Sequence, residues 1–223
     1  MPAQAEKKLV QDLLNSPRLS LYASQIQAVL DDEARRRQAF YAEISEADKA
    51  EFINGEVIYH SPVKLRHNIA VKYLLVLLDA YVRVTDSGLV GFEKLLISLT
   101  RNDYEPDICY FGKEKARRFR PDQMRFPAPD FVAEVLSAST AQYDRGVKFE
   151  DYAAHGVAEY WIVDPDAETI EQYCLQGDVY ELAIKAQTGE LKSCAISGFV
   201  IPVRAVFDER ENQAALRGVM RRD

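Results

Sequence analysis

Hydrophobic and polar positions recur with two different periods along the chain, and the change of period divides it into segments. Apolar residues recur with helical spacing over residues 4–14 and again, less densely, from about residue 22 to residue 44. The helix-breaking run Asn15-Ser16-Pro17 separates these two segments. The pattern therefore predicts a helical N-terminal extension over residues 1–45.

After residue 45 the pattern changes to short apolar runs that end at Gly, Pro or Asn-Gly pairs, which is typical of strands. Helical spacing returns only over residues 66–84 and 145–155, and Asp144 is expected to cap the second of these helices. Strands are expected over 52–59 (a hairpin with an Asn-Gly turn), 89–99, 106–111, 130–136, 159–163, 168–175, 179–185 and 198–203.

Two of the expected strands lack polar alternation. The runs FVAEVL and EYWIV are apolar almost throughout, as are strands that helices cover on both faces. We therefore predict an α/β fold, in which residues 46–208 form a mixed β-sheet flanked by helices, with a β-rich C-terminal part. Residues 209–223 are expected to form a short tail.

Composition narrows the class of protein. Hydrophobic residues make up 48% of the 223 residues and charged residues 28%, as in ordinary globular domains. The net charge of −7 argues against a protein that coats nucleic acid through overall charge, although a local basic surface can still bind it. Because no apolar run is long enough to span a bilayer and the N-terminus carries charges, we expect a cytoplasmic protein without a membrane segment. The three cysteines lack CxxC spacing, and their odd number favours reduced thiols.

Carboxylates occur inside three of the apolar runs. Asp107 follows Pro106 at the start of PDICYF, Glu134 lies within FVAEVL, and Glu56 lies within GEVIY. An unpaired carboxylate in a core is costly, so it requires a cation or a shifted pKa. Two carboxylates on adjacent strands can share a hard divalent ion such as Mg²⁺. The alternative is that these acids pair with Arg or Lys and only hold the sheet together.

Lys148 lies about one turn into the helix that follows the strand of Glu134, where it can point back towards the strand ends. Two carboxylates, a divalent metal and a lysine suit the hydrolysis of phosphodiester bonds. The metal lowers the pKa of a bound water and stabilises negative charge in the transition state.

Three sequence segments taken together resemble the Uma-type endonucleases of the PD-(D/E)xK, restriction-endonuclease-like superfamily. These segments are PDICYF, FVAEVLSAST and DRGVKFEDYAAHGVAEYWIVDP, and the resemblance extends over roughly residues 40–208. It implies a restriction-endonuclease-like core with a site for Mg²⁺ or Mn²⁺ at the edge of the sheet.

The resemblance also implies roles for single residues. Asp107 matches the aspartate of the PD element, and Glu134 matches the acid of the (D/E)xK element. Leu136 stands where the usual lysine would be, and Lys148 matches the lysine that this family takes from the next helix. Glu56 resembles a further acidic metal ligand, a role that Glu51 or Glu93 could serve instead.

His67, near the start of the predicted helix 66–84, suits phosphate contact or general-base work beside the acids, or is a surface histidine. His60 and His155 are interpreted as structural. Ser137, Ser139 and Thr140 form a polar loop after the strand of Glu134, which either binds phosphate or makes a turn.

The segment from 112 to 126 is rich in Lys and Arg in an otherwise acidic chain. It follows the strand of Asp107, so it is a candidate surface for the phosphate backbone of DNA, or else a solvated loop. The candidate DNA-contacting residues are Lys113, Lys115, Arg117, Arg118 and Arg120, with Arg145 at the start of the predicted helix 145–155.

The leading hypothesis is a divalent-metal-dependent endonuclease that hydrolyses DNA. Asp107, Glu134 and Glu56 would hold the metal, while Lys148 and His67 would assist the attacking water. The alternatives are a non-catalytic, nuclease-like module that binds nucleic acid or protein, and a subunit of a larger complex. By analogy with enzymes that cut two strands, we expect a homodimer.

Overall fold

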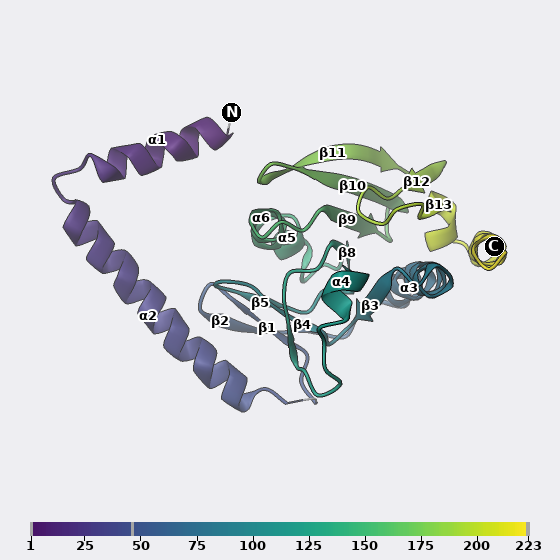
Figure 1. The fold of residues 1–223 in the computed structure, drawn as a ribbon, viewed down its shortest axis with the longest axis horizontal. Coiled ribbons are helices and arrows are strands. Elements are labelled where there is room, and N and C mark those ends of the chain that lie inside the picture. The colour runs from purple at the N-terminus through teal and green to yellow at the C-terminus, as the bar shows by residue number, and fades with distance from the viewer. Residues whose placement is uncertain (1, 46, 222–223) are drawn as a thin grey trace.

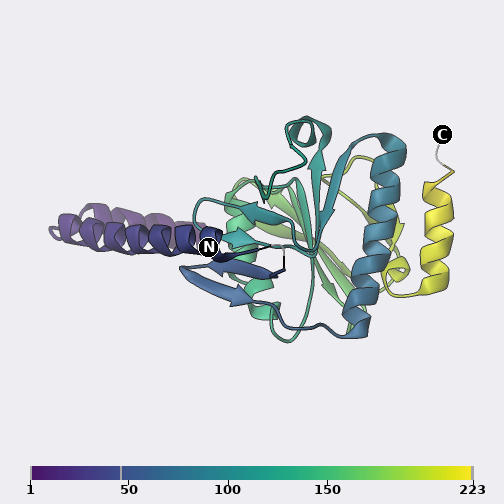
Figure 2. The same ribbon diagram turned by 90° about the horizontal axis from the view of Figure 1, so that it is seen from below.

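The computed structural model describes residues 2–45 and 47–221. Helices α1 (Pro2–Leu14) and α2 (Leu19–Glu43) form the N-terminal extension and project away from the rest of the molecule (Figures 1 and 2). The end of α2 joins the body, where Phe40 is buried and Arg37 donates two hydrogen bonds, of 2.6 and 2.9 Å, to Asp103. The predicted helical extension is confirmed.

The central sheet has six strands in the order β11-β10-β9-β8-β6-β3. They are β3 (Gly88–Phe92), β6 (Ile108–Gly112), β8 (Phe131–Val135), β9 (Glu159–Asp164), β10 (Thr169–Gln176) and β11 (Val179–Ala186). Strands β8 and β9 are parallel, and the other neighbouring pairs are antiparallel. Every residue of β8 is buried, as its apolar sequence predicted.

Helices cover both faces of this sheet, which confirms the predicted α/β class. On one face, α3 (Leu65–Thr85) packs against Phe131 and Trp161, and α7 (Glu209–Val219) lies on the outside of α3 (Figure 2). On the other face, α6 (Val147–Ala154) places Tyr152 against Val132. Residues 209–221 of the expected tail therefore include a packed helix.

A second sheet has five strands in the order β2-β1-β5-β4-β7. They are β1 (Ala50–Ile53), β2 (Glu56–Tyr59), β4 (Leu96–Ser98), β5 (Asp103–Tyr104) and β7 (Arg125–Phe126). Asn54 and Gly55 join β1 to β2 with positive φ angles of 50° and 85°, as the predicted Asn-Gly turn requires.

One predicted strand and one predicted helix cap are wrong. The expected strand 89–99 is divided between the two sheets, because Glu93 takes a positive φ of 55° and breaks it. The expected helix 145–155 corresponds to α6, but Gly146 precedes α6, and Asp144 is the last residue of a separate short helix, α5 (Ala141–Asp144), so Asp144 does not cap α6. The remaining elements are α4 (Lys113–Ala116), β12 (Glu190–Lys192), β13 (Val200–Pro202) and the 3-10 helix η1 (Val203–Val206). None of the helices in the described residues is long and apolar enough to cross a membrane.

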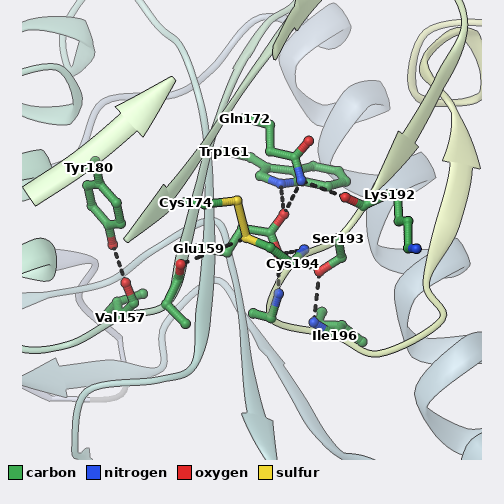
Figure 3. The surroundings of a disulfide bond; sticks show 12 residues. Val157, Glu159, Trp161, Gln172, Cys174, Tyr180, Lys192, Ser193, Cys194 and Ile196 are labelled. Atoms are coloured by element: carbon green, nitrogen blue, oxygen red, sulfur yellow. Dashed lines mark hydrogen bonds between the residues drawn. A yellow bond between two sulfur atoms is a disulfide. The ribbon is translucent and has the colours of Figure 1, made fainter. Parts of the chain in front are cut away.

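The expectation of reduced thiols is wrong for two of the three cysteines. Cys174 on β10 forms a disulfide with Cys194 in the loop after β12 (Figure 3), while Cys109 is a buried free thiol. The buried carboxylate of Glu159 accepts hydrogen bonds from Trp161, Gln172 and Ser193 and from the backbone N–H groups of residues 194 and 195. This anchoring holds the loop against β10, a proximity that sequence spacing did not reveal.

Loss of this disulfide should destabilise the protein, because the bond restricts a loop between residues 20 positions apart in the unfolded chain. We expect a reductant to lower the free energy of unfolding by about 3 kcal/mol, measured by urea denaturation. The Cys174→Ser/Cys194→Ser double variant is the control, since its stability should not respond to reductant. Equal stability of the wild type with and without reductant would contradict the prediction.

Candidate active site

Asp107 and Glu134 meet on one face of the central sheet. Strand β6 pairs Ile108 with Ala133 of β8, so the two acids adjoin a paired position on neighbouring strands. Because side chains alternate along a strand, Glu134 shares the face of Val132, the face that α6 covers. The Asp107 N–H donates to Glu134 Oε2 at 3.2 Å, and the Val135 N–H donates to Asp107 Oδ2 at 2.9 Å. The sheet itself thus fixes both carboxylates.

Lys148 reaches these acids from α6 and is itself only 2% exposed. Its Nζ lies 3.1 Å from Glu134 Oε1, 2.9 Å from Glu51 Oε1 and 3.2 Å from Asp144 Oδ1. A single ammonium therefore faces three buried carboxylates. Lys148 is the second residue of α6, and its ammonium group lies beside the acid on β8.

The pKa shifts follow from this imbalance of charge. Burial opposes the charge of Lys148, but the surrounding carboxylates raise its pKa well above the ordinary value. Burial raises the pKa of Glu134 well above its usual range, because the charge of Lys148 offsets that penalty only in part. Burial also works against the charge of Glu51, yet Lys148 and His60 lower its pKa.

His67 and Lys49 are the cationic neighbours of Asp107. His67, on the first turn of α3, is buried, and its Nε2 lies 3.5 Å from Asp107 Oδ1. Burial disfavours its charged form, but the contact with Asp107 raises the pKa of His67. Lys49 Nζ lies 4.0 Å from the same oxygen and 2.7 Å from Glu93. The structure therefore brings His67 beside the acid pair.

Glu56 is not part of this cluster. It is exposed on β2, which is the edge strand of the second sheet, whereas Glu51 on the inner strand β1 is buried and contacts Lys148. Of the acids that the sequence left open as alternatives to Glu56, Glu51 thus lies in the cluster. The signal was present in the sequence, because Glu51 lies within the apolar run AEFI just as Glu134 lies within FVAEVL.

Sequence reasoning missed three further residues at the cluster: His60, Glu105 and Asp144. His60, interpreted as structural, lies 3.4 Å from Glu51, and Glu105 receives no hydrogen bond on its buried Oε2. Burial and the nearby Glu51 charge raise the pKa of Glu105 to about 7. His60 follows the hairpin and Glu105 precedes Pro106, so neither lies in an apolar run that would have marked it.

The predicted DNA-contacting segment that begins at Lys113 lies away from Asp107. Lys113 follows the far end of the five-residue strand β6, about 20 Å along the chain from Asp107. Lys113 pairs with Asp86, Lys115 with Asp130, Arg117 with Glu114 and Arg120 with Asp122, while Arg118 is exposed. Arg145 donates two hydrogen bonds to Glu171, at 2.8 and 3.0 Å. Most of these cations thus already have an acidic partner.

The oxygen atoms at the centre of the cluster suit a hard divalent cation. A small cavity of about 30 Å³ is lined by Asp107, Glu134 and Glu105 together with both lysines, and it has room for an ion or a water. In the described part of the chain, five carboxylates (Glu51, Glu105, Asp107, Glu134 and Asp144) lie near the two lysines Lys49 and Lys148 and the two histidines His60 and His67. The unpaired Oε2 of Glu105 and this crowding of carboxylates are the features that a divalent ion would satisfy.

A second group of possible ligands does not suit a metal. Glu159, Cys174 and Cys194 have ligand atoms within 4.8 Å of one another. However, the two sulfur atoms are bonded to each other, and hydrogen bonds occupy both oxygens of Glu159 (Figure 3).

The sequence pattern of the Uma2 family, described as "Putative restriction endonuclease", matches residues 36–204. The chain belongs to the Uma2 family. A relative from Synechocystis sp. (strain ATCC 27184 / PCC 6803 / Kazusa), "Uncharacterized protein sll1609", is 30% identical over 134 residues, which are 59% of this chain and 75% of the relative.

The fold of this Uma2 protein is similar to a crystal structure described as a putative nuclease belonging to DUF820 from Anabaena variabilis ATCC 29413. The TM-score is 0.65 at 20% identity, and the match covers 79% of this chain and 96% of the other. The Uma2 match begins within α2 and ends within η1, so it contains the whole acid cluster. The restriction-endonuclease family expected from the three sequence segments is confirmed.

Replacing Lys148 by Met should leave three buried carboxylates without their shared cation. We expect a loss of about 3–5 kcal/mol in the free energy of unfolding at neutral pH, measured by urea denaturation. Because Lys148 helps to lower the pKa of Glu51, its contribution is present above the ordinary pKa of about 4.5 and is lost as the pH falls. The deficit of the variant should therefore shrink in acid.

The matched control is Lys72→Met, which changes an exposed lysine on α3 and should alter stability by less than about 0.5 kcal/mol. If Lys148→Met were as stable as this control at neutral pH, the three contacts of Lys148 would not be what holds the cluster together.

Proposed function

We propose that this Uma2 protein is a divalent-metal-dependent endonuclease that hydrolyses DNA. The observation that supports this most strongly is the convergence of Asp107, Glu134 and Lys148 in one buried cluster. This acid–acid–lysine set is assembled from neighbouring strands and the following helix. In this proposal residues 46–208 form the nuclease domain and the protein acts in the cytoplasm.

Asp107 and Glu134 would hold the metal, with Glu51 or Glu105 as further oxygen ligands in the place first given to Glu56. Bound there, Mg²⁺ or Mn²⁺ supplies a water of lowered pKa and positive charge near the scissile phosphate. Lys148 contributes a second positive charge that stabilises the same negative charge as it develops. His67, held beside Asp107, is placed to accept or donate a proton at its ring nitrogens.

The binding partners in the proposal are DNA and a second copy of the chain. The basic segment that begins at Lys113, together with Arg145, stays a prediction as a surface that contacts phosphate. Within this segment Arg118 is exposed, and it is not a member of the ion pairs described above. Helices α1 and α2 carry large apolar side chains that are more than half exposed, among them Leu9, Leu21 and Val29. These side chains support a homodimer formed through the N-terminal extension.

Cleavage by the purified protein tests the proposal. We expect supercoiled plasmid and single-stranded DNA to be cut with Mg²⁺ or Mn²⁺ and not with EDTA. Asp107→Asn and Glu134→Gln should each reduce the rate by about a hundredfold or more, because each removes a charge that the reaction needs. Asp79→Asn changes an aspartate on the surface of α3 and should cut at the wild-type rate.

Cleavage that persists unchanged in both acid variants would remove this site assignment. If the folded wild-type protein cut neither substrate with either metal, the non-catalytic binding module or the subunit of a larger complex would be the better description.

A further inference from the structure

A cavity of about 360 Å³ lies beside the acid cluster. Its walls come from three places in the chain: the segment before α3 with the first turn of α3, the loop after β8, and the end of β9 with the turn after it. It is therefore at the carboxyl ends of the two parallel strands, where α/β sheets commonly bind ligands.

The cavity shares part of its lining with the small cavity of the acid cluster. His67, Ser137, Ser139 and Val63 line both this cavity and the small one that contains Asp107 and Glu134. His67 is 6% exposed, and its Nε2 faces Asp107. A ligand in the larger cavity would thus lie one side chain away from the acid pair.

The lining combines apolar surfaces with polar groups at the edges. Pro62, Leu136 and Pro165 provide apolar walls, and Ser137 contributes a hydroxyl that is bonded to Ser139 at 3.1 Å. At the rim, the half-exposed Arg66 pairs with Asp166 at 2.7 Å. Lys64 lies at the same rim, and Asp164 is the second acid. The two cations and two acids balance, so the rim does not favour a ligand of high charge.

We propose that this cavity holds one unpaired nucleotide next to the phosphate that is cut, so that the enzyme acts on DNA with single-stranded character. The proposal rests on the nuclease function proposed above. A nucleobase has apolar faces and polar edges, as the cavity walls do, and its single phosphate can lie against Lys64 and Arg66. A base pair stacked in a duplex presents only its edges, so the nucleotide must be unpaired or extruded to enter.

Binding without cleavage tests the cavity separately from catalysis. A short fluorescein-labelled DNA strand of mixed sequence and the same strand in a duplex are titrated with protein in EDTA, with fluorescence anisotropy as the readout. We expect the single strand to bind about tenfold more tightly than the duplex. Ala138→Trp, which fills the cavity from an exposed position, should weaken single-strand binding about tenfold and duplex binding by less than about twofold.

Ala214→Trp is the matched control, because Ala214 is an exposed alanine on α7 outside the cavity, and it should bind as the wild type does. Ala138→Leu adds a smaller side chain to the cavity and should give an intermediate loss of single-strand affinity. This variant serves as the test if the tryptophan variant does not fold. Equal affinity of the wild type for both DNA forms, or unchanged single-strand binding by Ala138→Leu and Ala138→Trp, would overturn the proposal.

Cleavage in Mg²⁺ separates this inference from the proposed function. DNA cutting that is unaffected by filling the cavity would leave the nuclease in place and remove the nucleotide site. Single-strand binding that depends on Ala138, in a protein that does not cut, would keep the nucleotide site and remove the nuclease.

Discussion

The contact of Lys148 with three buried carboxylates is the interaction on which the rest of the site depends. Glu51 comes from the second sheet, Glu134 from the central sheet, and Asp144 and Lys148 from the helices that follow it. One ammonium therefore joins separate parts of the fold at a single point. Because one ammonium cannot neutralise three buried carboxylates, burial still raises the pKa of Glu134 well above its usual range.

The buried charges of this cluster are better explained by a function than by a contribution to stability. An apolar centre of the same shape would be at least as stable, since burying ions is costly. Side chains that retain such a cost are often found at functional sites, where perturbed charges have chemical uses. The cluster also adjoins a cavity at the carboxyl ends of β8 and β9, and His67 forms part of the wall between the two. The fold therefore places a charged centre and a ligand-sized space next to each other.

Much of the fold could be predicted from local pattern. The apolar runs around Glu134 and Trp161 correspond to buried strands, and Asn54-Gly55 forms the expected hairpin turn. The proximity of Asp107 and Glu134 could also be anticipated, because two carboxylates on adjacent strands can share a divalent ion. Contacts between residues that are distant in the sequence could not be predicted from the local pattern. Nothing near Cys174 in the sequence indicates Cys194, and the exposed Glu56 and the buried Glu51 both lie in short apolar runs whose position in the sheet is set by strand pairing.

Binding of Mn²⁺ to the purified protein, measured by isothermal titration calorimetry, tests the central claim most directly. If the acid cluster is a metal centre, the wild type should bind Mn²⁺ saturably, and Asp107→Asn should weaken binding by about tenfold or more while remaining folded. Saturable binding that Asp107→Asn leaves unchanged, or a folded wild type that binds no Mn²⁺, would contradict the account.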